Sequence, residues 1–289
     1  MPFLAGTHIE IIRPDIPRGQ FRSVLFDFDG TLSLIREGWQ GVMIPMLVEI
    51  LQALDTGETR EELTAIVTEF VDRLTGKQTI YQMIELCAQV ERRGGQPLEP
   101  LAYKHAYLDR LWERIAHRVH GLQEGSIAPA DMVVPGTFEV LENLRQRGLT
   151  CYLASGTDQP YVLDEADALG IVPYFAADAG ADLRAGGKQD VRIFGALEEY
   201  RRFSKAQVIQ DILRTHRLSG SQLLTFGDGF VEIEEARAVG GVAVGVASDE
   251  ANRQGINEWK RSRLIQAGAD IIVPDFGEQA VLIEYLWNE

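Results

Sequence analysis

Two aspartates at the end of a short apolar segment form the pattern in this sequence that is best suited to chemistry. Asp27 and Asp29 flank Phe28 directly after the run SVLF, and a Gly30-Thr31 turn follows them. Two carboxylates this close together could bind a hard cation, and they could also supply a nucleophile and a proton-transfer group. An Asp-Gly turn by itself is common. A buried charge without a partner is costly, however, so two acids beside an apolar strand favour a functional interpretation.

Two further segments place polar residues where a helix would begin. Ser155 and Gly156 follow the apolar run LTCYLA, and Pro160 suits the first turn of a helix. Ser155 and nearby backbone N–H groups could therefore bind a phosphate oxygen, although a helix start without a ligand explains the same residues equally well. Lys205 opens an amphipathic segment, where the helix dipole favours an anion over a cation. A functional role for this lysine gains support from that mismatch.

A third acidic position lies at Asp228, which stands between two glycines after the apolar run QLLTF. Glu232 follows it four residues later, so the two carboxylates could complete a metal site. A turn followed by a helix cap is the alternative explanation. Each of these signals is modest alone. Their order on successive strand ends is what favours a shared function.

The periodicity of apolar residues predicts alternating strands and helices in most of the chain. Strands are expected at 23–28, 149–154, 222–226, 241–247 and 270–273, and helices at 136–147, 160–169, 205–216, 230–239 and 256–267. Strands without strict polar alternation, separated by helices, indicate a parallel sheet covered on both faces. Ligands in such sheets bind beyond the carboxyl ends of the strands, so the polar positions above are expected to meet there.

A separate helical unit is expected between the first two strands. Residues 34–128 contain four consecutive amphipathic stripes and no convincing strand, as in a helical bundle. Because the first strand precedes this unit, the unit is most simply an insertion into an α/β core made of residues 1–33 and 129–289. Residues 1–19 are expected to be an extension that leads to the first strand.

Composition limits the partners that the chain can take. The 28 lysines and arginines face 43 aspartates and glutamates, which gives a formal net charge of −15 and argues against nucleic acid or anionic membranes as partners. An anionic substrate would need a cation close by. The two cysteines suit a reducing compartment, and no signal peptide or membrane span is evident at the start or later, so a cytoplasmic protein is expected. The oligomeric state is not indicated.

In these residues the chain resembles the haloacid dehalogenase-like hydrolase superfamily. The first family motif, DxDGT, matches Asp27 to Thr31, and the second, an apolar strand that ends in Ser or Thr, matches Ser155. The third motif is a lysine, which matches Lys205, and the fourth, GDxxxD or GDxxxE, matches Gly227 to Glu232. Glu232 stands where aspartate is commoner in the family. The resemblance implies a Rossmann-like parallel-sheet core with an inserted all-α cap, as in phosphoglycolate phosphatases and β-phosphoglucomutases.

The resemblance also implies a role for the first-motif aspartates. Asp27 would attack phosphorus and become an aspartyl phosphate, while Asp29 would protonate the leaving oxygen and later activate water. Mg²⁺ would be held by the Asp27 carboxylate, the Asp29 backbone carbonyl and Asp228. Glu232 would either ligate the metal or support the site from behind.

The phosphoryl group would be bound by the other two motifs. Ser155, the Gly156 amide and Lys205 would hold it and offset its developing charge. Lys188, in a Gly-Gly-Lys stretch, competes for the third role. Lys205 is preferred because its spacing from Ser155 and Asp228 is typical of the family, and Lys188 is then a loop charge.

Within the family, the acid at Asp29 restricts the expected function to that of a phosphatase or a phosphomutase. Hydrolysis of a small phosphate monoester is the primary hypothesis, and the helical cap favours a sugar phosphate. The alternatives are a phosphomutase of the β-phosphoglucomutase type and a non-catalytic binding protein that uses this fold. The cap is expected to close over the site and select the substrate. The candidates for substrate contact are Arg36, Gln40 and Lys77, whereas Trp39 is expected to lie in the core of the first helical stripe.

Overall fold

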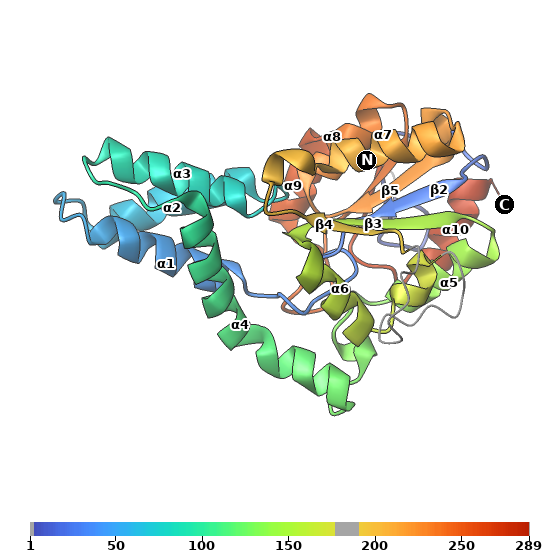
Figure 1. The fold of residues 1–289 in the computed structure, drawn as a ribbon. Coiled ribbons are helices and arrows are strands. Elements are labelled where there is room, and N and C mark those ends of the chain that lie inside the picture. The colour runs from blue at the N-terminus through green and yellow to red at the C-terminus, as the bar shows by residue number, and fades with distance from the viewer. Residues whose placement is uncertain (1–2, 177–190, 289) are drawn as a thin grey trace.

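The computed structural model describes residues 3–176 and 191–288, and these form a Rossmann-like α/β core with a helical insert (Figure 1). In the described residues the sheet has seven strands in the order β1-β7-β6-β5-β2-β3-β4. The strands are β1 (Glu10–Ile11), β2 (Ser23–Phe26), β3 (Thr150–Asp158), β4 (Ile193–Ala196), β5 (Leu223–Gly227), β6 (Val242–Val246) and β7 (Ile271–Val273). All neighbours pair in parallel except β1, which runs antiparallel to β7. The predicted fold class is confirmed.

Helices cover both faces of the sheet, as parallel strands require. They are α5 (Thr137–Gln146), α6 (Gln159–Ala168), α7 (Lys205–His216), α8 (Phe230–Ala238), α9 (Glu258–Gln266) and α10 (Gln279–Trp287). In Figure 1, α7 and α8 lie above the sheet, and α5, α6 and α10 lie below it. Successive residues of β2 point to opposite faces: Val24 and Phe26 pack in one core cluster, and Leu25 packs with α7 in another.

The chain leaves the sheet after β2 and forms four helices before it returns to β3. They are α1 (Gln40–Gln52), α2 (Arg60–Leu74), α3 (Ile80–Arg92) and α4 (Pro100–Glu124), which we call the helical insert. Thr59 and Glu62 form a capping box that starts α2. Pro100 starts α4, and Gly125 ends it in a left-handed conformation at φ 76°. In Figure 1 the insert projects to the left of the sheet, and α4 runs back toward the core.

Some elements differ from the sequence-based expectation. The segment 1–19 is more than an extension, since Glu10–Ile11 forms β1 at the edge of the sheet. Strand β4 and helix α10 were not predicted. The strand predicted to end at residue 154 continues as β3 to Asp158, because β4 pairs along it with a register shift between Ala154 and Asp158. Among the described residues, no helix is both long and apolar enough to cross a membrane.

Candidate active site

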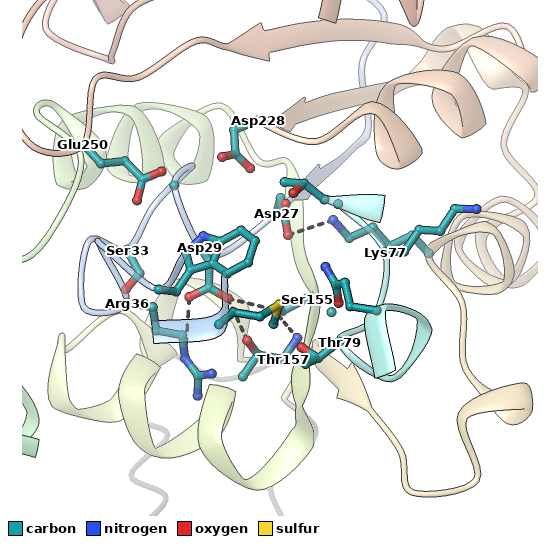
Figure 2. Close-up of a pocket in the computed structure, with 18 of the residues that line it drawn as sticks. Asp27, Asp29, Ser33, Arg36, Lys77, Thr79, Ser155, Thr157, Asp228 and Glu250 are labelled. Atoms are coloured by element: carbon teal, nitrogen blue, oxygen red, sulfur yellow. Dashed lines mark hydrogen bonds and ion pairs between the residues drawn. The ribbon is translucent and has the colours of Figure 1, made fainter. Parts of the chain in front are cut away.

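The predicted polar positions meet in a cavity of about 110 Å³ at the carboxyl ends of the neighbouring strands β5, β2 and β3 (Figure 2). Asp27 and Asp29 follow β2, Ser155 lies in β3, and Asp228 follows β5. Lys205 reaches the same cavity from the first residue of α7. The helical insert and Trp39, which directly precedes it, supply a further part of the lining. This part includes Trp39, Met43, Thr79, Gln82 and Tyr107.

Asp27 is the centre of a buried ionic cluster. The Lys205 ammonium lies 2.9 Å from Asp27 Oδ1 and 2.7 Å from Glu232 Oε2. The other oxygen of Glu232 accepts a hydrogen bond from the Gly229 amide at 2.7 Å, so this side chain both caps α8 and holds Lys205. Burial raises the pKa of Asp27 well above its ordinary value, Lys205 opposes the rise, and the Glu232 and Asp228 carboxylates add to it. Positive charge in the cavity is therefore needed to keep Asp27 ionised.

Asp29 lies beside this cluster and is oriented by β3. Thr157 Oγ1 donates to Asp29 Oδ2 at 2.8 Å, and Ser155 Oγ donates to the same oxygen at 3.3 Å. Asp29 Oδ1 is buried and accepts no hydrogen bond from the residues that the structure describes. Gly30 makes the turn possible, because it has φ +73° and a Cβ there would lie 2.2 Å from Asp228 Oδ2.

Asp228 has a partner that sequence reasoning missed. The Lys260 ammonium, from α9, lies 2.7 Å from Asp228 Oδ2 and 2.7 Å from Glu250 Oε1. It also donates to Ser248 Oγ at 3.1 Å. A signal was present in the sequence: Lys260 falls on the apolar stripe of its helix, four residues before Leu264.

The carboxylates of the cavity form a donor set that fits a divalent cation. One oxygen each from Asp27, Asp228 and Glu232 lies within 4.8 Å of the others. The acidic groups near this point outnumber the ammonium groups: Asp27, Asp29, Asp228, Glu232 and Glu250 face Lys205 and Lys260. Carboxylate oxygens are the ligands that Mg²⁺ prefers, and a surplus of buried negative charge favours its binding. The site therefore fits a hard divalent cation.

The structure separates the predicted specificity residues. Arg36 lines the cavity, but Glu165 of α6 binds its guanidinium with contacts of 2.6 and 3.0 Å, and Asp29 Oδ1 is 3.8 Å from its Nε. The amide of Gln40 donates to Asp72 within the insert at 3.1 Å, and Gln40 is not among the residues that line the cavity. The start of α1 thus turns Gln40 away from the site.

Lys77 and Trp39 both line the cavity, but neither side chain lies simply where the sequence predicts. Lys77 lines the cavity and yet is exposed, and its ammonium lies 5.9 Å from each of the Tyr81 and Phe230 rings. In Figure 2 the Lys77 side chain points away from the carboxylates. Trp39 packs against the main core cluster, as predicted, but it also lines the cavity. Lys188, the alternative to Lys205, lies outside the described residues.

Comparisons with known proteins agree with this geometry. A family model of haloacid dehalogenase-like hydrolases matches residues 21–240. The fold is similar to that of a predicted phosphatase from Clostridium acetobutylicum (18% identity, 91% of this chain and 98% of that one, TM-score 0.55). It is also similar to a predicted phosphoglycolate phosphatase from Haemophilus somnus (17%, 91% and 98%, TM-score 0.54) and to β-phosphoglucomutase from Clostridium difficile (13%, 92% and 97%, TM-score 0.55). A search of curated proteins found no match.

Proposed function

The chain belongs to the haloacid dehalogenase-like hydrolase family, and we propose that it is a Mg²⁺-dependent phosphatase of a small phosphate monoester. The observation that carries the proposal is the buried triad of Asp27, Lys205 and Glu232, with Asp29 and Asp228 beside it at the same strand ends. A binding protein has no use for several buried carboxylates around one lysine, since their desolvation destabilises the fold.

In this proposal Asp27 is the nucleophile. Its carboxylate attacks phosphorus, the bond to the leaving oxygen breaks, and an aspartyl phosphate forms on Asp27. Asp29 gives its proton to the leaving oxygen in that step and takes one from water when the aspartyl phosphate is hydrolysed. Thr157 holds the Asp29 carboxylate in place for both transfers, at 2.8 Å. Lys205, Ser155 and the Gly156 amide stabilise the negative charge on the phosphoryl oxygens.

Mg²⁺ would be held by Asp27, Asp228 and the backbone carbonyl of Asp29. When bound, it would offset the charge of the phosphoryl group and keep the nucleophile ionised. Both oxygens of Glu232 already have partners, the Gly229 amide and Lys205, so we assign this residue a supporting role.

The helical insert would act as the cap that excludes water from the reaction. Its loop between α2 and α3 lies against the core: a Cβ on Gly156 would be 3.0 Å from the Lys77 carbonyl oxygen. Gln78 of this loop donates to the Phe203 carbonyl at 2.8 Å. On the other side, Arg263 of α9 donates to the Asp72 and Thr75 carbonyls at the end of α2. These contacts support the proposal that the insert closes over the carboxylates.

The test is phosphate release from a panel of small phosphate monoesters with Mg²⁺, together with the mass of the acid-quenched enzyme. We expect release that EDTA abolishes and a phosphoryl group on Asp27. Asp27→Asn should remove both. Asp270→Asn is the matched control, because Asp270 is equally buried but pairs with Arg13 away from the cavity, and it should retain activity.

Two results would overturn the proposal. Isomerisation of a bisphosphate without net phosphate release would identify a phosphomutase. Absence of both reactions in folded, Mg²⁺-loaded protein would identify a non-catalytic binding protein.

A further inference from the structure

Two polar side chains of the insert line the cavity and have no hydrogen-bond partner among the described residues. Gln82 of α3 and Tyr107 of α4 are each 3% exposed. The Gln82 carboxamide oxygen is buried and accepts no hydrogen bond. Buried amides and hydroxyls in folded proteins are almost always partnered, because an unpaired polar group loses its water without compensation. The unpartnered Gln82 oxygen therefore indicates a ligand that completes its hydrogen bond, and Tyr107 lines the same cavity.

The same helices show that this is not a general property of their polar residues. Gln89, two turns further along α3, is also buried, and its carboxamide binds Glu85 and Arg93. Tyr103, one turn before Tyr107 in α4, is buried and accepts a hydrogen bond from the Leu98 amide. Of the two α3 glutamines, the one with an unpartnered oxygen lines the cavity and the fully partnered one does not.

Two of the cations nearest to Gln82 and Tyr107 are already paired with carboxylates. Arg36 is bound by Glu165, and Lys104 of α4 is paired with Asp158. The Lys77 ammonium lies between the Tyr81 and Phe230 rings, away from the carboxylates. With the acidic cluster opposite, a carboxylate or second phosphate on the substrate would find only Lys77 as an unpaired cation among the described residues that line the cavity, and its ammonium points away from the carboxylates. Neutral donors and acceptors remain as the available contacts.

The size of the cavity limits the ligand further. About 110 Å³ must hold the phosphoryl group and the leaving group together in this closed arrangement. Pockets for drug-sized ligands are several times larger, roughly 300–1,000 Å³. This size favours a leaving group of a few carbon atoms over a nucleotide or a peptide. Trp39 and Met43 supply an apolar surface for its carbon skeleton.

We infer that Gln82 and Tyr107 form a subsite for an uncharged, hydroxylated leaving group, so the substrate is the phosphate of a short polyol or small sugar. The Gln82 oxygen accepts from one substrate hydroxyl, and the Tyr107 hydroxyl and the Gln82 amide bond to others. The inference rests on the proposed phosphatase function. It adds that the substrate carries no second anionic group.

The test compares three monoesters with the same three-carbon skeleton: glycerol 3-phosphate, propyl phosphate and 3-phosphoglycerate. We expect kcat/KM to be highest for glycerol 3-phosphate and lowest for 3-phosphoglycerate. Gln82→Leu and Tyr107→Phe should each lower the ratio of glycerol 3-phosphate to propyl phosphate by about fivefold, the size of one neutral hydrogen bond.

Two control variants separate recognition from structure. Gln89→Leu and Tyr103→Phe remove partnered groups of the same types from the same helices, and the substrate ratio should stay at its wild-type value. Gln82→Leu should unfold at the same temperature as wild type or a higher one, because it removes an unpaired buried group, whereas Gln89→Leu should unfold at a lower one.

The outcomes distinguish this inference from the proposed function. Phosphate release with a ratio that Gln82→Leu and Tyr107→Phe leave unchanged, or a preference for 3-phosphoglycerate, overturns the subsite and leaves the phosphatase standing. Absence of phosphate release overturns the phosphatase. In that case calorimetric binding of the same three compounds to the Mg²⁺-loaded Asp27→Asn variant still decides the subsite, since binding does not require turnover.

Discussion

The cavity has two walls whose polar groups are paired differently. We call them the core wall, which carries Asp27, Ser155, Lys205 and Asp228, and the insert wall, which carries Gln82 and Tyr107. On the core wall, Lys205 lies between Asp27 and Glu232 at ion-pair distance, and all three are buried. On the insert wall, Gln82 and Tyr107 are equally buried, and the Gln82 carboxamide oxygen has no hydrogen-bond partner among the described residues. The core wall is therefore arranged before any substrate binds, and the insert wall is completed by the substrate.

This difference follows from what each wall must do. Charge stabilisation is most effective when the groups are held in place beforehand, because no energy is then lost in reorienting them during the reaction. Recognition of a neutral leaving group needs donors and acceptors that are free when the substrate arrives, since an analogue that lacks the hydroxyls then leaves buried groups unpaired. One cavity can thus combine charged groups that are held in place beforehand with polar groups that are free to bind the substrate.

The largest effect is expected from removing the shared cation of the core wall. Lys205→Met leaves Asp27 and Glu232 buried without their partner, so the free energy of unfolding should fall by about 3–5 kcal/mol. The loss of charge at the phosphoryl group should lower kcat/KM by about a thousandfold. Phosphate release and urea unfolding measure the two effects.

Lys104→Met provides the comparison for that experiment. Lys104 is also a buried lysine, but it belongs to the insert and pairs with Asp158 outside the cavity lining. It should lose stability while keeping kcat/KM within about tenfold of wild type. Equal losses of kcat/KM in the two variants would contradict the special role of the core wall.

The next effect concerns the pH dependence of stability at the junction of the walls. Burial raises the pKa of Glu165, and Arg36 opposes that rise. In Arg36→Met the folded-state pKa of Glu165 should rise further. Below pH of about 4.3 the carboxyl is protonated in the folded and unfolded states alike, so its contribution to the loss of stability is small there. Above that pH the Glu165 carboxyl ionises more readily in the unfolded chain than in the folded variant. The loss of stability should therefore grow to about 3 kcal/mol near neutral pH.

Urea unfolding of Arg36→Met between pH 4 and 8 measures this dependence. The double variant Arg36→Met/Glu165→Gln should recover most of the loss at neutral pH. A loss that is independent of pH, combined with a higher KM, would instead make Arg36 a substrate-binding residue.

A smaller effect is expected from loosening Asp29. Thr157→Val removes the 2.8 Å hydrogen bond that orients Asp29 Oδ2 and leaves the longer contact to Ser155. We expect kcat to fall by about tenfold with KM nearly unchanged, because proton transfer and not substrate binding is impaired. Thr157→Ser keeps the hydroxyl and should restore most of kcat. An equal change in KM and no rescue by serine would argue for a structural role only.

The sequence allowed the core wall to be predicted better than the insert wall, for a physical reason. Asp27, Ser155 and Asp228 follow buried strands, and parallel strands bring their carboxyl ends to one edge of the sheet. Where an insert residue points depends instead on how the helices pack on the core. The prediction for Gln40 was wrong in this respect, since its amide binds Asp72 inside the insert.

Charged residues on apolar helical stripes were the missed signal. Glu165 and Lys260 both occupy positions where the helical period predicts an apolar residue, between Val162 and Leu169 and before Leu264. A charge at such a position is tolerated when it has a buried partner, and here the partners are Arg36 and Asp228. The partners come from distant segments, so the stripe can indicate that an ion pair exists but not which residue completes it.

The smallest effect is expected at Lys77, and it tests whether the insert wall lacks a free cation. Lys77→Ala should change KM for the best substrate by less than about twofold, because the exposed ammonium lies between the Tyr81 and Phe230 rings and away from the carboxylates. Steady-state kinetics with glycerol 3-phosphate and 3-phosphoglycerate measures this. A large rise in KM for 3-phosphoglycerate alone would mean that the ammonium swings into the cavity when an anionic group is present. The insert wall would then recognise charge as the core wall does, and the contrast between the two walls would be lost.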